Sequence, residues 1–353
     1  MKKIVISGYY GFDNLGDEAV LAGITSLIKK YDLDTKITVL SSKPEKTAEL
    51  YGVNAVSRTS LIQISAVLAE ADLFISGGGS LLQDVTGSFS VPYYLSLAWL
   101  AKIQGVKTVY YAQGAGPLNK KFSQKLTAFT LNRFNFLGVR DQGSKDLLKK
   151  IGVKKDVKLT VDPVFALYDK LNVNRQKIKG KLEIGISVRP WSVDYLKKLA
   201  EGLNKFAESK NCKFIIYPMH QGADENPSQI LKDLLESEAE LLTLPVEPEQ
   251  ALKEFSNLDL FVGVRLHSLI FALLNKIPLL ALSYDPKIEG LMSEIDYLPL
   301  IKLENLESEL LIEKLDYLMS ERYSLRKKLK DYVQQKKQAA EDFAELVLKE
   351  DST

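Results

Sequence analysis

Residues 1–21 read MKKIVISGYYGFDNLGDEAVL: a short apolar run, a glycine-rich turn, and a segment with helical periodicity. This order of strand, turn and helix is typical of the first βα unit of a parallel sheet. The turn is unlike a dinucleotide-binding loop, because its glycines do not follow the GxGxxG spacing and its helix begins with Asp17 and Glu18. Two carboxylates in a first helical turn favour the helix dipole but would repel a phosphate bound there.

The same alternation continues along the chain in two series. Apolar runs predict strands at 3–7, 36–40, 73–76, 108–112 and 136–139, and then at 183–188, 214–218, 241–244, 260–264 and 278–282. Amphipathic segments predict helices at 18–31, 93–104, 122–134, 193–208, 226–237, 248–257 and 266–275. The polar stretch 173–181, VNRQKIKGK, separates the two series and indicates a linker.

We therefore expect an α/β protein with two Rossmann-like domains, each built on a parallel sheet. The predicted boundaries are 1–172 for the first domain, 173–181 for the linker, 182–318 for the second domain and 319–353 for C-terminal helices. From about Asn305 the chain is helical and mixes acids with bases, which indicates a packing helix with a solvated face.

Composition excludes several classes of protein. A chain of 353 residues, 46% of them hydrophobic, is long enough to bury two cores, and its net charge of +2 gives no global field for nucleic acid. The single cysteine, Cys212, lies beside an apolar run and excludes disulfides and a cysteine-rich zinc site. The chain enters a strand-like run after two lysines, so we expect a cytoplasmic protein.

Glycine-rich turns follow three predicted strands of the first half. They are GYYGFDNLGDE after 3–7, GGGSLLQD after 73–76 and QGAGP after 108–112. Ligands of open parallel sheets bind beyond the carboxyl ends of the strands, so three such turns predict a ligand site at this edge. Gly77, Gly78 and Gly79 would let backbone N–H groups approach a ligand, although glycines also simply reverse a chain.

Cationic or protonatable side chains follow the strands of the second half. They are Arg189, His220, Arg265, His267 and Lys287, and Arg140 holds the equivalent place in the first half. His267 begins an apolar helix, where orphan N–H groups attract anions, and Arg265 offers a planar fork for a carboxylate or phosphate. A histidine that merely caps the helix is the alternative interpretation.

With these segments in place, the sequence resembles the polysaccharide pyruvyl transferases, of the CsaB type that acts in bacterial cell-wall polysaccharide synthesis. The matching segments are GYYGFDNLGDEAVL, ISGGGSLLQD, YAQGAGP, VRD at 139–141, DP at 162–163, GVRLHSLIFA and SYDPK. The resemblance implies a GT-B-like fold, in which two Rossmann-like domains face a central cleft and a C-terminal helix crosses back. It implies phosphoenolpyruvate as donor, no cofactor or metal, and a pyruvate ketal formed on a sugar.

The resemblance also implies roles for individual residues. The donor would be bound by Arg265, Leu266, His267 and Lys287, with Arg140 as a further donor-binding arginine and Arg189 as its competitor. A carboxylate and a phosphate on one small molecule require such a cluster of cations and a helix N-terminus. We expect His267 to act as general acid or phosphate-side proton donor, with His220 as a second candidate.

With the donor bound by the second half, the glycine-rich turn after residues 3–7 becomes the acceptor side. Its carboxylates then no longer have to lie beside a phosphate. Asp13, Asn14 and Asp17 suit sugar hydroxyls, and Asp13 or Asp17 would be the general base. We place Gly16, Gly78, Gly79 and Gln113 on the same acceptor wall. The alternative is that Asn14 or Asp13 caps the helix while Asp17 and Glu18 favour its first turn.

The expected acceptor is a lipid-linked disaccharide containing N-acetylmannosamine, modified across O4 and O6. Such an acceptor would bring the enzyme to the inner face of the membrane without an anchor, while the oligomeric state is left open. Two competing functions are a GT-B glycosyltransferase with a nucleotide-sugar donor and a catalytically inactive scaffold subunit.

Overall fold

The computed structural model describes residues 1–85, 87, 89–171, 181–245 and 247–349, and it divides into two compact units. Unit 1 comprises Met1–Leu167 and Lys336–Thr353, and unit 2 comprises Tyr168–Gln335. Apart from Lys181, the predicted linker at 173–181 lies outside the described residues.

Unit 1 is built on a seven-stranded parallel sheet with the order β3-β2-β1-β4-β5-β6-β7. Its strands are β1 (Lys3–Ser7), β2 (Lys36–Ser41), β3 (Asn54–Ser57), β4 (Leu73–Gly77), β5 (Lys107–Gln113), β6 (Phe136–Val139) and β7 (Lys158–Leu159). Its helices are α1 (Leu15–Tyr31), α2 (Pro44–Tyr51), α3 (Leu61–Ala69), α4 (Ser90–Ile103), α5 (Lys121–Leu131), α6 (Gln142–Lys150) and the 3-10 helix η1 (Pro163–Lys170), which ends in unit 2.

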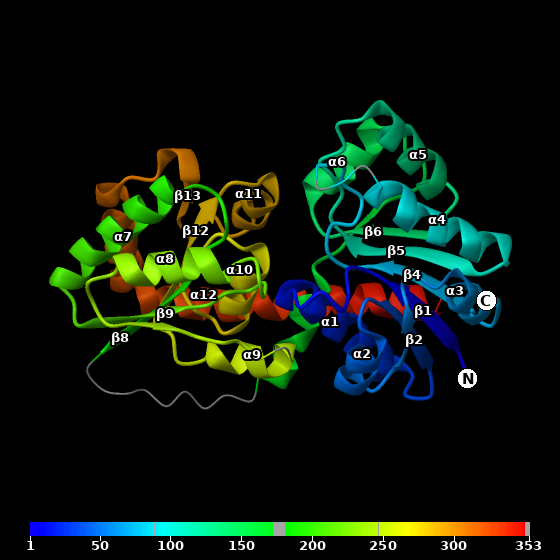
Figure 1. Cartoon of the computed structure of the whole chain (residues 1–353), viewed down its shortest axis with the longest axis horizontal. Coiled ribbons are helices and arrows are strands. Elements are labelled where there is room, and N and C mark those ends of the chain that lie inside the picture. Colours follow the sequence, from blue (N-terminus) through cyan, green and yellow to red (C-terminus); the bar gives the residue numbers. More distant parts are fainter. Residues whose placement is uncertain (86, 88, 172–180, 246, 350–353) are drawn as a thin grey trace. The chain divides into compact units, whose positions relative to one another are not determined.

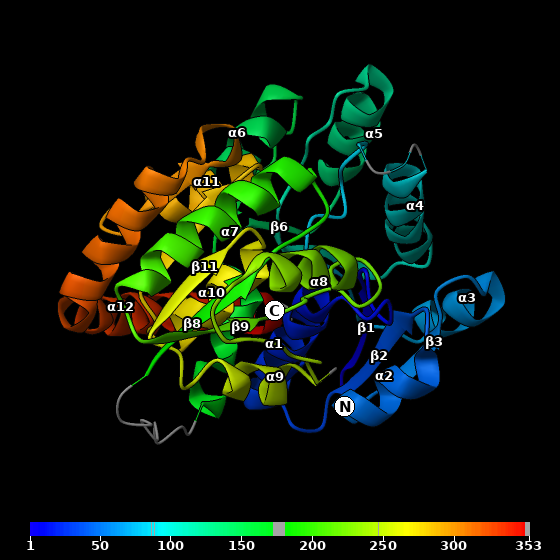
Figure 2. The ribbon, with the colours of Figure 1, turned by 60° about the vertical axis from the view of Figure 1, so that its left-hand side comes forward.

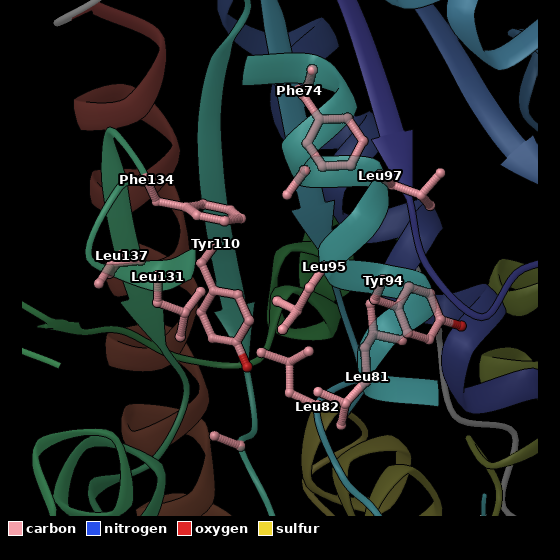
Figure 3. Close-up of a cluster of buried hydrophobic side chains, with 14 of the residues drawn as sticks. Phe74, Leu81, Leu82, Tyr94, Leu95, Leu97, Tyr110, Leu131, Phe134 and Leu137 are labelled. Atoms are coloured by element: carbon pink, nitrogen blue, oxygen red, sulfur yellow. The ribbon is translucent and has the colours of Figure 1, made fainter. Parts of the chain in front are cut away.

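The sheet of unit 1 is covered on both faces. Figure 1 shows α4, α5 and α6 on one face, and α1 with the C-terminal part of α12 (Ser308–Lys349) on the other. On the α4 face, Phe74, Tyr110 and Phe134 pack against Leu95 and other apolar side chains of α4 (Figure 3). Because both faces are buried, the strands consist of the continuous apolar runs seen in the sequence.

Unit 2 repeats this design with a six-stranded parallel sheet in the order β10-β9-β8-β11-β12-β13. Its strands are β8 (Leu182–Ser187), β9 (Cys212–Ile216), β10 (Ala239–Leu241), β11 (Leu260–Gly263), β12 (Leu279–Ser283) and β13 (Leu300–Lys302). Its helices are α7 (Val193–Glu208), α8 (Glu225–Leu234), α9 (Pro248–Glu254), α10 (Leu266–Leu274), α11 (Pro286–Ser293) and the 3-10 helix η2 (Leu303–Asn305). Figure 2 shows α7 and α8 side by side.

The last helix, α12, begins in unit 2 and ends in unit 1. In unit 1 the ring of Phe343 lies 5.0 Å from that of Tyr111, and a Cβ atom at Gly138 would collide with it. Glu341 also forms an ion pair of 2.7 Å with Lys30 of α1. Glycine at position 138 therefore lets the helix pack directly on β6.

The predicted parallel α/β class and helical C-terminus are confirmed. Sequence analysis missed β3, β7, β13, α2, α3, α6 and α11, and it placed β10 at 241–244 instead of Ala239–Leu241. All three missed strands lie at sheet edges, where partial exposure removes the continuous apolar run. Among the described residues, every helix is too short or too polar to cross a membrane.

Candidate functional site

The glycine-rich turn after β1 is held by buried hydrogen bonds. The hydroxyl of Tyr10 donates to the carbonyl of Gly77 (2.6 Å), and the N–H of Gly11 donates to Glu18 (2.7 Å). Glu18 also accepts a hydrogen bond of 2.7 Å from Tyr51. Burial raises the pKa of Glu18, against the lowering effect of these hydrogen bonds. Glu18 thus holds the turn onto α1 and α2 rather than meeting a ligand.

Asp13 lies in the same turn with a left-handed backbone (φ 57°). Its carboxylate pairs with Lys43 and, at 2.9 Å, with Lys46. Partial burial would raise the pKa of Asp13, but the hydrogen bonds from the two lysines outweigh it and lower the pKa. A carboxylate held by two cations is a weak base, so this geometry favours Asp17 over Asp13 as general base.

Asn14 caps α1, since its side-chain oxygen accepts a hydrogen bond from the N–H of Gly16 (3.1 Å). Asp17 is half-buried in the first turn of the helix. A Cβ atom at Gly79 would lie 2.5 Å from an oxygen of Asp17. The fold therefore brings the turn after β1 against the turn after β4, as the shared sheet edge predicts.

The turn after β4 has left-handed glycines, with φ 80° at Gly78 and 65° at Gly79. Gln113, at the end of β5, is fully buried and donates a hydrogen bond of 2.9 Å to the hydroxyl of Ser76. In this position the Gln113 side chain supports the neighbouring strand through Ser76, and its predicted contact with the acceptor stays a prediction. Gly78 remains part of the loop at the edge.

Arg140 is the only predicted donor residue in unit 1. Its side chain is 6% exposed and forms an ion pair of 2.7 Å with Asp162, which is 4% exposed. It also donates a hydrogen bond of 3.2 Å to the hydroxyl of Ser80. The guanidinium is therefore neutralised by a buried carboxylate and connects the turns after β4 and β6 to the segment before η1.

In unit 2, Arg265 is held by a carboxylate that sequence analysis did not single out. Its Nε donates to Asp224 at 3.0 Å, and its Nη2 donates to the second oxygen of the same carboxylate. Asp224 is fully buried and also accepts a hydrogen bond of 3.0 Å from the N–H of His220. Asp224 thereby orients Arg265 and ties it to the turn that carries His220.

Leu266 and His267 are the first two residues of α10, directly after the N-cap Arg265. Both are half-buried, and they lie beyond the carboxyl end of β11. Lys287 lies in the first turn of α11, after β12, where its N–H donates to the capping Asp285 (3.0 Å). These residues therefore share the edge of the unit 2 sheet at which its helices begin.

Arg189 follows β8 at the same edge and differs from Arg140 and Arg265. Its guanidinium lies 4.2 Å from the centre of the Tyr284 ring, and its Nε donates to the carbonyl of Pro190 (3.3 Å). None of the carboxylates in the described part of the chain forms an ion pair with it. Its positive charge is thus available to a ligand, which favours Arg189 over Arg140 as the further donor-binding arginine.

A cavity of about 410 Å³ opens beside Arg189 within unit 2. Trp191, Tyr195 and Tyr284 supply aromatic walls. The charged lining mixes two lysines with three acids: Lys198, Lys302, Asp194, Glu289 and Glu304. The rings of Trp191 and Tyr284 lie 5.5 Å apart. This cavity was not predicted from the sequence, although Trp191 and Tyr284 each follow a strand closely, which is a position typical of ligand sites.

Sequence analysis also missed an aromatic cluster in unit 1. The guanidinium of Arg58 lies 5.0 Å from the ring centre of Phe12, 4.6 Å from that of Tyr93 and 5.5 Å from that of Tyr94. Burial raises the pKa of Tyr94 to about 12, so its hydroxyl stays protonated. Arg58 follows the missed strand β3, and nothing in its local sequence indicates a site.

Two α/β units with parallel sheets and a helical C-terminus define a protein of the GT-B type. Similar solved structures include the UDP-GlcNAc 2-epimerase of Neisseria meningitidis (TM-score 0.65, 15% identity, 99% of each chain covered) and HepE of Anabaena (TM-score 0.67, 15% identity, 99% of this chain and 100% of that chain). A glycosyltransferase of Rickettsia africae is also similar (TM-score 0.62, 14% identity, 97% of this chain and 93% of that chain). These identities support the fold alone.

The family is shown by sequence. The model of the polysaccharide pyruvyl transferase family matches residues 14–286, which is more than half of the chain. This protein therefore belongs to the polysaccharide pyruvyl transferase family. No curated protein sequence matches the chain significantly.

Proposed function

We propose that this protein transfers pyruvate from phosphoenolpyruvate to a saccharide and forms a pyruvate ketal. The observation that carries the proposal is the group of cations at the carboxyl edge of the unit 2 sheet. Arg189, Arg265, His267 and Lys287 all follow strands of that sheet, and two of them lie at the start of α10. A small ligand with a carboxylate and a phosphate needs this combination of charge and helix N-terminus.

In this proposal Arg189 and Arg265 have different tasks. Arg265 is fixed by Asp224, so it offers only the side of its guanidinium that faces away from that carboxylate. Arg189 retains its full charge and would take the larger share of the donor's negative charge. Lys287 would add a second point charge from the start of α11.

The reaction balances without a redox step. A proton is added to C3 of phosphoenolpyruvate, one sugar hydroxyl attacks C2, and the bond between C2 and the phosphate oxygen breaks. The second hydroxyl then attacks C2 to close the ketal. The hydroxyl protons account for the new methyl hydrogen and for the proton on the released phosphate. We assign the proton donor to His267 and the base that accepts a hydroxyl proton to Asp17.

The acceptor in this proposal is a lipid-linked cell-wall saccharide of the CsaB branch, used at the inner face of the cytoplasmic membrane. Asp17 and the turn at Gly78 and Gly79 would contact the sugar hydroxyls. Asn14 and Gly16 then form the helix start that holds Asp17 in place. The support is the crowding of these turns at one sheet edge.

The test is phosphate release from phosphoenolpyruvate over a panel of free and lipid-linked saccharides. We expect release only with acceptor present, and His267→Gln should lower kcat by about 100-fold or more with little loss of stability. Ser293→Ala, on the exposed part of α11, is the control that should leave the rate unchanged. Wild-type release by a folded His267→Gln variant would refute the assigned role.

A nucleotide-sugar donor is the competing function, because the similar structures include an epimerase bound to UDP-GlcNAc and HepE in complex with UDP-glucose. Ligand-linked stabilisation separates the two, since only a ligand that binds the folded protein raises its Tm. We expect phosphoenolpyruvate to raise the Tm and UDP to leave it unchanged. A rise with UDP alone would favour the glycosyltransferase, and a rise with neither would favour a scaffold role.

A further inference from the structure

The charge of unit 1 is distributed unevenly along the sequence. Residues 85–140 contain seven lysines and arginines and no aspartate or glutamate, although the whole chain has a net charge of only +2. Two helices, α4 and α5, lie within this acid-free segment and pack side by side (Figure 2). Arg140 is neutralised by Asp162, so the other six basic residues give this nearly neutral protein a local basic field.

The outward face of α5 combines this charge with exposed aromatic rings. Phe122 is 68% exposed and Phe129 is 51% exposed. They are two helical turns apart, about 10 Å along the axis, and Lys121, Lys125 and Arg133 are exposed beside them. The guanidinium of Arg133 lies 3.7 Å from the ring centre of Phe129. Large rings in water beside cations are unusual for a surface that meets only solvent.

The exposed apolar surface extends beyond α5. Trp99 of α4 stacks on Phe129 with ring centres 5.5 Å apart. Phe89, just before α4, is 84% exposed. The carboxylate of Asp84 accepts a hydrogen bond of 2.8 Å from the backbone N–H of Lys120, which ties the segment before α4 to the start of α5. Rings from both helices are thus held by one local framework.

We infer that the face formed by Phe89, Trp99, Phe122 and Phe129 with Lys121, Lys125 and Arg133 binds the surface of an anionic lipid bilayer. We name it the α4–α5 face. Its rings would enter the boundary between headgroups and acyl chains, while the long basic side chains reach lipid phosphates. The spacing of Phe122 and Phe129 on one side of α5 sets the helix axis parallel to the membrane plane.

Charge complementarity favours an anionic lipid bilayer as the partner of the α4–α5 face. The acid-free segment that carries this face attracts the negative leaflet, and each basic residue near a bilayer surface contributes about fivefold to affinity. The half-buried ring of Trp99 adds apolar surface beside Phe129, while its N–H donates to the hydroxyl of Thr130 at 3.0 Å. The inference does not depend on the proposed reaction, since the contact needs no saccharide.

The experiment measures co-sedimentation of the full chain with vesicles of phosphatidylcholine alone or with added phosphatidylglycerol. We expect binding only to the anionic vesicles, weakened by salt. Lys121→Gln with Lys125→Gln should lower the affinity about 25-fold, and Phe122→Ser with Phe129→Ser about 10-fold or more. The matched controls are Lys327→Gln with Lys330→Gln on exposed α12, and Leu33→Ser, which removes a leucine 84% exposed in another loop.

Unchanged Tm values would show that the variants fold. Equal binding to both kinds of vesicle, equal loss in the control variants, or no sedimentation at all would overturn the inference. Binding of a DNA duplex without vesicle binding would assign the face to nucleic acid and overturn it equally. Phosphate release from phosphoenolpyruvate with a soluble acceptor is measured separately, so failure of the membrane contact and failure of the reaction are distinguishable.

Discussion

At the scale of single residues, the two arginines that competed for the donor differ in their partners. Arg140 is buried against Asp162, whereas Arg189 rests on the ring of Tyr284 and keeps its charge. A buried pair is expensive to break, because the remaining partner is left as an uncompensated charge. The same residue type therefore serves stability in unit 1 and is available for binding in unit 2.

Arg189→Gln and Arg140→Gln should separate these two roles. We expect Arg189→Gln to raise the KM for phosphoenolpyruvate about 10- to 100-fold, the value of a charge-assisted hydrogen bond, and to leave stability nearly unchanged. Arg140→Gln should lower the free energy of unfolding by about 3 kcal/mol because Asp162 loses its partner. Denaturant titration and donor kinetics on both variants provide the measurement. The reverse pattern would return Arg140 to the donor site.

The ion pairs of Asp13 with Lys43 and Lys46 should make the stability of the protein depend on pH. Because Lys43 and Lys46 lower its folded pKa, its contribution is fully present above the unfolded pKa of about 3.9 and is lost as the pH falls through the lower folded value. Wild type should therefore exceed Asp13→Asn in stability at neutral pH, with the difference disappearing in acid. Unfolding curves from pH 7 downward test this. A difference that grows in acid would contradict the assigned ion pairs.

At the scale of elements, the turn of the first βα unit both stabilises the fold and carries a candidate site residue. Its carboxylates are divided by position: Glu18 is buried under the turn, Asp13 is held by lysines, and Asp17 faces Gly79. Asp13 and Asp17 are both partly exposed at the sheet edge, but Asp13 is paired with Lys43 and Lys46. Asn14 fixes the start of α1 and so fixes the direction of Asp17.

Asn14→Ala should remove the cap of α1. We expect the free energy of unfolding to fall by about 1 kcal/mol, with turnover reduced no more than a few-fold. Asn14→Asp is the matched control, because aspartate caps a helix equally well. A large loss of turnover in both variants, without loss of stability in the second, would instead place the amide in contact with the acceptor. Chemical denaturation and phosphate release measure the two quantities.

At the scale of the whole molecule, the end of the chain completes the first unit. The residues from Lys336 onward cluster with unit 1, and Phe343 covers Gly138 and Tyr111. Unit 1 therefore lacks part of one core face until the stretch that begins at Lys336 has been synthesised. This arrangement couples the folding of the N-terminal half to the C-terminus.

Phe343→Ala should destabilise unit 1 specifically. Loss of a phenylalanine that is 6% exposed costs about 3–5 kcal/mol. Tyr323→Ala, at an exposed position earlier in α12, should cost less than about 0.5 kcal/mol. Hydrogen exchange would report the effect, with faster exchange expected in β5 and β6 of the first variant only. Equal acceleration in the strands of unit 2 would show that the contact is not local to unit 1.

The sequence by itself determined the parallel α/β class, most buried strands, the helical C-terminus and the placing of glycines and cations after strands. Those features are encoded locally, in continuous apolar runs and in the residues that directly follow them. Only the tertiary structure decided what each charge does, because Asp224 reaches Arg265 across 41 positions and Asp162 reaches Arg140 across 22. It likewise decided that Gln113 is buried, that Arg189 stays available, and that rings of α4 and α5 meet on one exposed face. Pairing, burial and exposure depend on contacts between distant segments, and no local pattern contains them.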